Sequence, residues 1–200
     1  QRNSERLERL VGDLLFFAEA GREQALLKRS RVDLRALASS CVDSMAPQAQ
    51  AAGVELVCAG GGVPAVEGDP SLLGQVVENL VANAIKFSSK GSRVELRTSS
   101  TETEVVLAVT DNGIGIPPGE QSQVFERFFR SSNATAQAVQ GTGLGLAIAK
   151  VIVEAHGGAI SLESGEGTGT CVWVTLPLPS RGGTVEPESS AAGLEVTTSP

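Results

Sequence analysis

Three glycines at alternate positions open an apolar, helix-prone run, QGTGLGLAIAK, at residues 140–150. Glycine at this density is costly in chain entropy, so the run needs a reason for its bare backbone. The typical reason is a phosphate group at a helix N-terminus, where unpaired N–H groups and the helix dipole favour an anion. A P-loop is excluded because no Lys-Ser/Thr pair follows the glycines. A dinucleotide-binding fingerprint also fits poorly, because SNATAQAVQ stands where a strand is required.

Length and charge narrow the possible functions. Two hundred residues suit one domain with attached segments, or at most two small domains. A formal net charge of −7 argues against nucleic acid as the main partner. No apolar run approaches the roughly 20 residues of a membrane-spanning helix. Cys41, Cys58 and Cys171 lack metal-ligand spacing, and we expect free thiols in a reducing compartment.

The pattern along the chain predicts four segments. Residues 1–21 carry apolar side chains at helical spacing from Leu7 to Phe17, which indicates an amphipathic helix that needs a partner. That partner is either the chain's own domain or the other half of a helical hairpin or dimeric bundle. A polar linker at residues 22–31 and a compact unit at residues 32–177 follow. Residues 178–200 are rich in Pro, Gly, Ser and Thr, so we expect a disordered tail.

The compact unit mixes helical and strand patterns. We expect helices at residues 34–45 (or on past Pro47 to Gly53), 70–87, 123–132 and 143–156, and strands at 54–60, 93–100, 103–111, 159–164 and 170–176. Asp69 and Pro70 have the residue types of an N-cap and a first helical position. The phenylalanines of FERFFR, at 125–130, are interpreted as anchors for the adjoining loop. Together these elements predict an α+β two-layer sandwich of a mixed, largely antiparallel sheet and about three helices.

The helix at 70–87 gathers unusual polar side chains on one face. Asn79, Asn83 and Lys86 fall within an arc of roughly 60° at 100° per residue, opposite an apolar stripe. An amide oxygen is a hard, neutral ligand suited to Mg²⁺, and a lysine attracts phosphate as a point charge. The alternative is that these are ordinary surface residues.

The strand ending at Asp111 places a carboxylate at the end of a buried row. Alternation puts Val105, Leu107, Val109 and Asp111 on one face. A buried carboxylate needs a donor, and the exocyclic amine of adenine is one candidate. The alternatives are a turn-forming Asp-Asn-Gly or a helix cap.

Four motifs in order carry a family resemblance. The stretches GDPSLLGQVVENLVANAIKFS, DNGIGIP, FERFFR and GTGLGLAIAK resemble the N, G1, F and G2 boxes of sensor histidine kinases, which share an ATPase superfamily with gyrase, Hsp90 and MutL. The resemblance extends from about residue 32 to residue 177. The opening ERLERLVGDLLFFAEA resembles the second helix of the dimerisation and phosphotransfer hairpin.

The resemblance implies a role for each matching position. Asn83 would be the main Mg²⁺ ligand with Asn79 beside it, and Lys86 would contact phosphate. Phe87 would line the nucleotide pocket. Asp111 would hold the adenine amine, and Gly113, Gly115 and Ile116 would shape the base pocket. Arg127 and Arg130 would bracket the γ-phosphate. Residues 131–140 would form an ATP lid, and the phosphate-side hinge and helix start would be Gly141, Thr142, Gly143, Leu144, Gly145 and Leu146.

The implied activity is transfer of the γ-phosphoryl group of Mg-ATP to an upstream histidine, for onward transfer to an aspartate of a response regulator receiver domain. The resemblance also implies a homodimer through the upstream hairpin and a cytoplasmic domain of a membrane-anchored sensor kinase. No phosphoacceptor motif occurs here. The only histidine is His156, at a helix end where a cation suits the dipole, and we interpret it as structural.

Alternative functions are an ATP hydrolase or clamp, an anti-sigma-type serine kinase, and a catalytically dead nucleotide-binding module. The first two disagree with Asn79, because related hydrolases carry a glutamate there to activate water, and an amide is a poor base. The third disagrees with the intact Asn, Asp and glycine positions.

Overall fold

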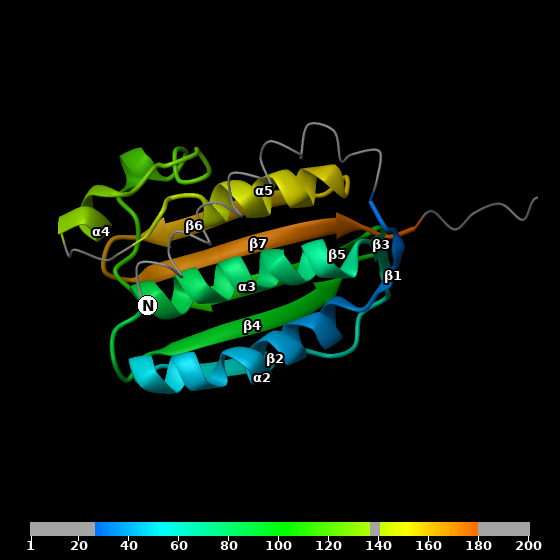
Figure 1. Ribbon diagram of the computed structural model, residues 1–200, viewed down its shortest axis with the longest axis horizontal. Helices are drawn as coiled ribbons and strands as arrows, with labels where there is room; N and C mark the ends of the chain where they lie inside the picture. The colour runs from blue at the N-terminus through cyan, green and yellow to red at the C-terminus, as the bar shows by residue number, and fades with distance from the viewer. Residues whose placement is uncertain (1–26, 137–140, 180–200) are drawn as a thin grey trace, which may run out of the picture.

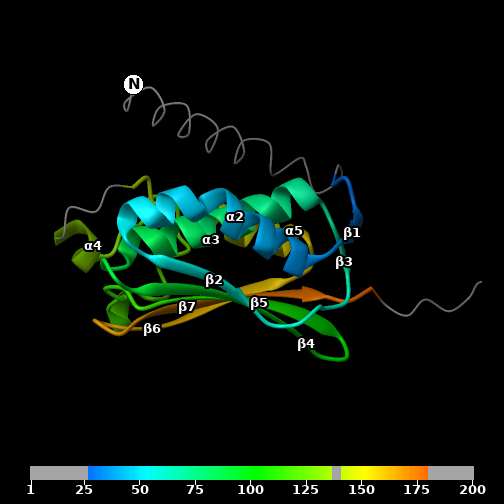
Figure 2. The same cartoon turned by 90° about the horizontal axis from the view of Figure 1, so that it is seen from below.

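The computed structural model describes residues 27–136 and 141–179. The helix expected at 1–21, the last four residues of the expected lid and residues 180–200 of the expected tail lie outside these ranges. Two layers make up the body: a five-stranded sheet, and three long helices that cover one of its faces (Figures 1 and 2). No helix within the described ranges is both long and apolar enough to cross a lipid bilayer.

The sheet has the strand order β2-β4-β5-β7-β6. The strands are β2 (Glu55–Ala59), β4 (Arg93–Ser100), β5 (Glu104–Asp111), β6 (Ala159–Gly165) and β7 (Gly169–Pro177). Only the β2–β4 pairing is parallel, so the expected mixed, largely antiparallel sheet is confirmed. The parallel pairing arises because β3 and α3 separate β2 from β4 along the chain.

Helices α2 (Leu34–Ala52), α3 (Pro70–Phe87) and α5 (Gly145–Ala155) lie side by side on the sheet (Figure 1). Helix α3 is central, because it packs against both α2 and α5, and its apolar stripe is buried. Asp69 is its N-cap and accepts from the N–H groups of Ser71 and Leu72, as the sequence predicted. Pro47 lies inside α2, which continues to a left-handed Gly53, so the longer alternative is correct.

A second, two-stranded sheet was not predicted. It pairs β1 (Ser30–Val32) with β3 (Val66–Gly68) in antiparallel fashion. Three-residue strands are too short to show alternation, which explains why the pattern missed them. The ordered unit therefore includes the last residues of the segment expected to be a linker.

The helix expected at 123–132 is wrong. That stretch forms successive turns after a short 3₁₀ helix (Pro118–Glu120), and a one-and-a-half-turn helix, α4 (Ser132–Ala136), begins where it ends. The backbone of Phe128 has a φ of 64°, which a continuous helix cannot contain, and its N–H donates to the Gly143 carbonyl. This conformation turns Phe128 outward, where 58% of it is exposed, so it does not anchor the loop to the core.

His156 connects the ends of two helices. It is 3% exposed, its Nε2 accepts from the Asp69 N–H at 2.9 Å, and its Nδ1 lies 2.7 Å from the Ile152 carbonyl oxygen. Because Nε2 accepts a hydrogen bond it carries no proton, and Nδ1 is the donor. The structural role is as expected, but the bonds come from a neutral ring, not from a cation at a helix end.

Candidate functional site

The candidate site lies where the end of α3, the start of α5 and the loop after β5 meet. Asn79 and Asn83, one turn apart on α3, face the first residue of α5. A Cβ added to Gly145 would lie 3.6 Å from Nδ2 of Asn83 and 3.8 Å from Oδ1 of Asn79. The structure therefore brings together two motifs that are more than 60 residues apart in sequence.

The start of α5 is open to an anion. Leu144 is its N-cap position and makes no side-chain capping bond, so the first N–H groups of this 11-residue helix have no side-chain acceptor there. Beside it, Nδ2 of Asn79 is buried and has no hydrogen-bond partner among the described residues. A buried donor without an acceptor is costly, which suggests that a ligand oxygen supplies the acceptor.

Two cations stand at the same end of α3. The ammonium of Lys86 lies 4.5 Å from the centre of the Phe87 ring. It also lies next to Gly141, four residues before the start of α5. Burial lowers the pKa of Lys86, and the positive charge of Arg130 lowers it further, so Arg130 lies close by. An anion between Lys86 and Arg130 would offset both the burial of the Lys86 charge and the repulsion between the two cations.

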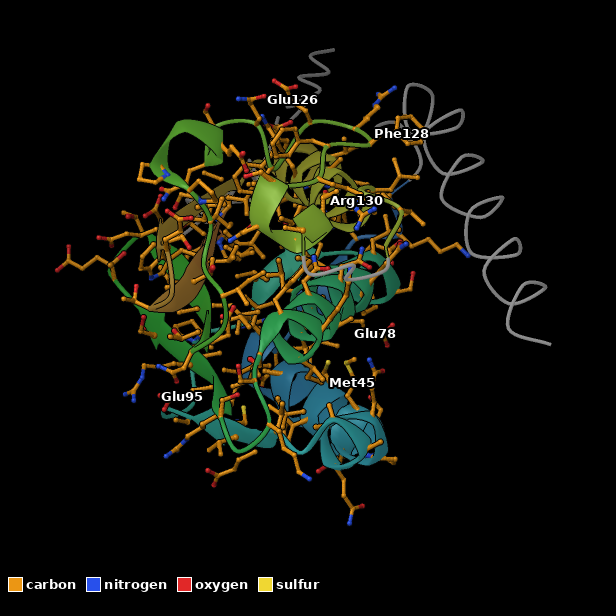
Figure 3. The ribbon with its side chains drawn as sticks, turned by 90° about the vertical axis from the view of Figure 1, so that its left-hand side faces the viewer. Met45, Glu78, Glu95, Glu126, Phe128 and Arg130 are labelled. Atoms are coloured by element: carbon orange, nitrogen blue, oxygen red, sulfur yellow. The ribbon has the colours of Figure 1, made fainter. Side chains whose placement is uncertain are left out.

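Figure 3 faces this end of the molecule and shows Arg130 and Phe128 on the loop that precedes α4. Arg127 is exposed in the same loop.

Asp111 ends β5 as predicted, with its carboxylate buried at 8% exposure. Its Oδ1 accepts from the N–H groups of Gly113, at 2.8 Å, and Thr170, at 3.3 Å. Burial raises the pKa of Asp111, and these two bonds act against the increase. One oxygen thus holds the following loop in place, and no described residue donates to the other, Oδ2.

Protein contacts account for the glycines in the loop after Asp111. A Cβ on Gly113 would overlap the Phe87 carbonyl, and one on Gly115, whose φ is 66°, would overlap the Gly165 carbonyl. The N–H of Ile116 donates to Oγ of Ser164 at 2.9 Å, which fixes the loop to β6. The glycines that we expected to admit a base are thus also required by the protein's own packing.

A cavity of about 400 Å³ opens beside this loop. Its lining residues are Ser89, Asn112, Gly113, Ile114, Asn133, Glu166 and Gly167. Gly113 of the expected base pocket and Asn133 of the expected lid line it, so the cavity adjoins the loop without reaching Asn79 or Asn83.

At the glycine-rich turn, Oγ1 of Thr142 accepts from the Leu144 N–H at 3.2 Å. Gly143 has a φ of 74°, and a Cβ there would meet the Phe129 carbonyl. Leu144 is fully buried and Leu146 is half-buried, so both leucines serve the packing of α5.

Comparison with known proteins assigns the family. Residues 68–180, more than half of the chain, match the model described as histidine kinase-, DNA gyrase B- and HSP90-like ATPase. The chain belongs to this ATPase family. The expected family and fold are therefore confirmed.

The matched relatives are sensor histidine kinases. The chain is 35% identical to the sensor histidine kinase RppB of Synechocystis sp. over 179 residues, which are 89% of this chain and 39% of RppB. It is 37% identical to the sensor histidine kinase WalK of Bacillus subtilis over 183 residues, which are 88% of this chain and 29% of WalK. The chain thus spans well under half the length of these relatives.

Comparison with solved structures agrees with this family assignment. Full-length ShkA in complex with AMPPNP superposes with a TM-score of 0.76 at 31% identity, over 88% of this chain and 36% of that one. The mycobacterial sensor histidine kinase MprB superposes with a TM-score of 0.65 at 34% identity, over 74% of this chain and 97% of that one. The chain is therefore a histidine kinase-type ATPase domain.

The sequence interpretation placed Asn133 in the expected lid at 131–140 but gave it no contact of its own. Asn133, in the first turn of α4, donates from Nδ2 to the Gly115 carbonyl at 2.7 Å. Nothing in the sequence connects an asparagine at the start of a short helix to a loop 18 residues earlier.

Proposed function

We propose that this ATPase domain binds Mg-ATP and transfers the γ-phosphoryl group to a histidine of a sensor kinase, for onward transfer to a response regulator aspartate. The observation that carries the proposal is the orphaned amide donor of Asn79 beside the uncapped start of α5. In such reactions the protein contributes mainly positioning and charge neutralisation.

The residues divide between the two ends of the nucleotide. The free Oδ2 of Asp111 would accept the exocyclic amine of adenine, which favours ATP over GTP, because guanine carries a carbonyl at that ring position. The N–H groups at the start of α5, with Lys86, would hold phosphate oxygens. Arg130, close to Lys86, would neutralise charge on the transferred group, with Arg127 as a second candidate.

The residues present fit Mg²⁺. No three His, Cys, Asp or Glu side chains of residues 27–136 and 141–179 are grouped as metal ligands. Mg²⁺ commonly takes one or two protein oxygens and completes its shell with substrate phosphates and water. The Asn83 amide oxygen, with Asn79 beside it, suits that role. When bound, the ion would neutralise phosphate charge.

The phosphoacceptor is a histidine that this sequence does not contain. His156 is the single histidine, and both of its ring nitrogens are engaged in buried hydrogen bonds. We propose that the acceptor lies on a helical hairpin that also forms a homodimer, as the resemblance of residues 1–21 implies. One of the solved neighbours, ThkA, was determined in complex with the response regulator TrrA, which supports the second transfer.

Calorimetry with AMPPNP tests nucleotide binding, with and without Mg²⁺. We expect binding that Mg²⁺ strengthens, and roughly tenfold or greater weakening in Asp111→Asn, because a buried acceptor is replaced by a donor. Glu104→Gln, which removes an exposed carboxylate at the start of the same strand, is the matched control and should bind normally. No binding at millimolar nucleotide would refute the proposal.

Incubation with radiolabelled ATP tests the phosphoacceptor assignment. The chain alone should acquire no acid-labile phosphohistidine. Labelling of His156 would contradict its role as a buried connection between helices.

A further inference from the structure

Asn133 makes hydrogen bonds in two directions. Its Oδ1 accepts from Oγ of Ser131 at 2.7 Å and from the Ala134 N–H at 2.8 Å, which fixes the start of α4. Its Nδ2 donates to the Gly115 carbonyl at 2.7 Å and lies 3.5 Å from the Ile114 carbonyl. One side chain therefore ties a helix start to the loop that follows Asp111.

The two directions serve different purposes. An aspartate at position 133 would keep both bonds at the start of α4, because each needs only an acceptor oxygen. The contact with Gly115 needs an amide donor of this length. Since the Ile114 carbonyl already accepts from the Gly167 N–H at 2.8 Å, the bond to Gly115 is the one that the asparagine adds.

Asn133 lies beside the loop that is assigned to the base in the proposed function. Asn133 lines the cavity of about 400 Å³ together with Asn112, Gly113 and Ile114 of the same loop. A second bond, from the Ser132 N–H to Glu120 at 2.9 Å, holds the neighbouring residue of α4 from the outer side. Figure 1 shows α4 at one end of the molecule, apart from the three long helices. Besides the buried side chain of Ala134, these bonds connect α4 to the loop after Asp111 and to Glu120.

We propose that Asn133 is a positioning residue that holds α4 against the Gly115 loop and so slows the release of bound nucleotide. The inference rests on the proposed function, because the loop is the one assigned there to the base. Asn133 itself touches no reacting atom. It acts through the Gly115 carbonyl, which it keeps in register with the start of α4.

The test compares two asparagines on the same cavity in the full chain. Asn133→Asp keeps the oxygen that accepts from Ser131 and Ala134 but replaces the donor to Gly115 with an acceptor. Asn112→Asp introduces the same charge on the cavity at an exposed residue whose side chain has no hydrogen bond among the described contacts. Asn133→Ser is uncharged and too short to reach the Gly115 carbonyl.

The measurements are association and dissociation rates of a fluorescent N-methylanthraniloyl ATP by stopped flow, and the melting temperature without nucleotide. We expect roughly tenfold faster dissociation in Asn133→Asp and a smaller increase in Asn133→Ser. Association rates should change less than twofold, and both melting temperatures should stay within about 2 °C of the wild type. Asn112→Asp should dissociate at the wild-type rate.

The other possible outcomes would each overturn the inference. Equal acceleration in both aspartate variants would assign the effect to charge and overturn the inference, as would unchanged dissociation in Asn133→Asp. A large fall in melting temperature in both position-133 variants would make Asn133 a purely structural residue. If the wild type binds no nucleotide, the proposed function fails and the inference fails with it. A wild type that binds, with an unaffected variant, overturns the inference alone.

Discussion

Replacing His156 with alanine should destabilise the domain strongly without impairing the site. The ring is buried between the start of α3 and the end of α5, and its Nε2 is the acceptor for the Asp69 N–H. In the variant that N–H is left buried and unpaired, which costs about 1–3 kcal/mol, and the Nδ1–H bond to Ile152 contributes about 1 kcal/mol more.

The lost ring also leaves a cavity. An added Cβ at Gly68 would lie 2.7 Å from Cδ2 of His156, so the ring is in tight contact with the backbone of β3. Removing the ring therefore costs packing as well as hydrogen bonds, and together these losses amount to about 3–5 kcal/mol. For a domain of this size that lowers the melting temperature by roughly 10 °C.

Circular dichroism during thermal and urea denaturation measures the effect. Glu154→Ala is the control, because Glu154 is exposed on the same helix and its side chain, among the described contacts, makes one i,i+4 ion pair with Lys150. It should cost less than about 0.5 kcal/mol. Nucleotide affinity of His156→Ala well below its melting temperature should stay within twofold. A fall of less than about 3 °C would refute the argument that the two bonds of His156 stabilise the fold.

Three further predictions concern the glycines and the two buried carboxylates. Gly143→Ala should destabilise the domain by about 1–2 kcal/mol, because the φ of 74° at Gly143 and the Phe129 carbonyl oppose a Cβ. Gly145→Ala should instead keep or raise the melting temperature and weaken nucleotide binding. Equal effects of the two substitutions on melting temperature would contradict the geometry. Burial alone raises the pKa of Asp69, but hydrogen bonds from Ser71, Leu72 and Lys28 outweigh it and lower that pKa. The stability that Asp69 contributes is therefore present above the unfolded pKa of about 4 and is lost as the pH falls through the folded pKa. Denaturation at pH 2 to 6 should show the free energy of unfolding of the wild type approaching that of Asp69→Asn at the acid end. The raised pKa of Asp111 has the opposite effect, because stability is lost as the pH rises through that pKa. Asp111→Asn should therefore melt at or above the wild-type temperature at pH 7. A melting temperature several degrees below that of the wild type would contradict this.

The central elements were predictable because their signals are local. The alternation that ends at Asp111 and the Asp-Pro start of α3 fix both register and helix start within a few residues. The FERFFR loop was not predictable in the same way. Its apolar spacing favours a helix, but the hydrogen bond from Phe128 to Gly143 imposes a positive φ, and that contact spans 15 residues. Tertiary contacts overrode the local pattern there.

The glycines show why the candidate site could be only partly predicted. A glycine in sequence marks a place where a Cβ does not fit, but it does not say whether a ligand or the protein itself excludes that Cβ. Here the protein's own backbone excludes it at Gly113, Gly115 and Gly143. At Gly145 the nearest described atoms to a Cβ would be those of Asn79 and Asn83, at ordinary contact distance, so packing among the described residues does not explain this glycine. The space in front of Gly145, bordered by an orphaned amide and open N–H groups, is therefore where the requirement for a bare backbone points to a bound phosphate.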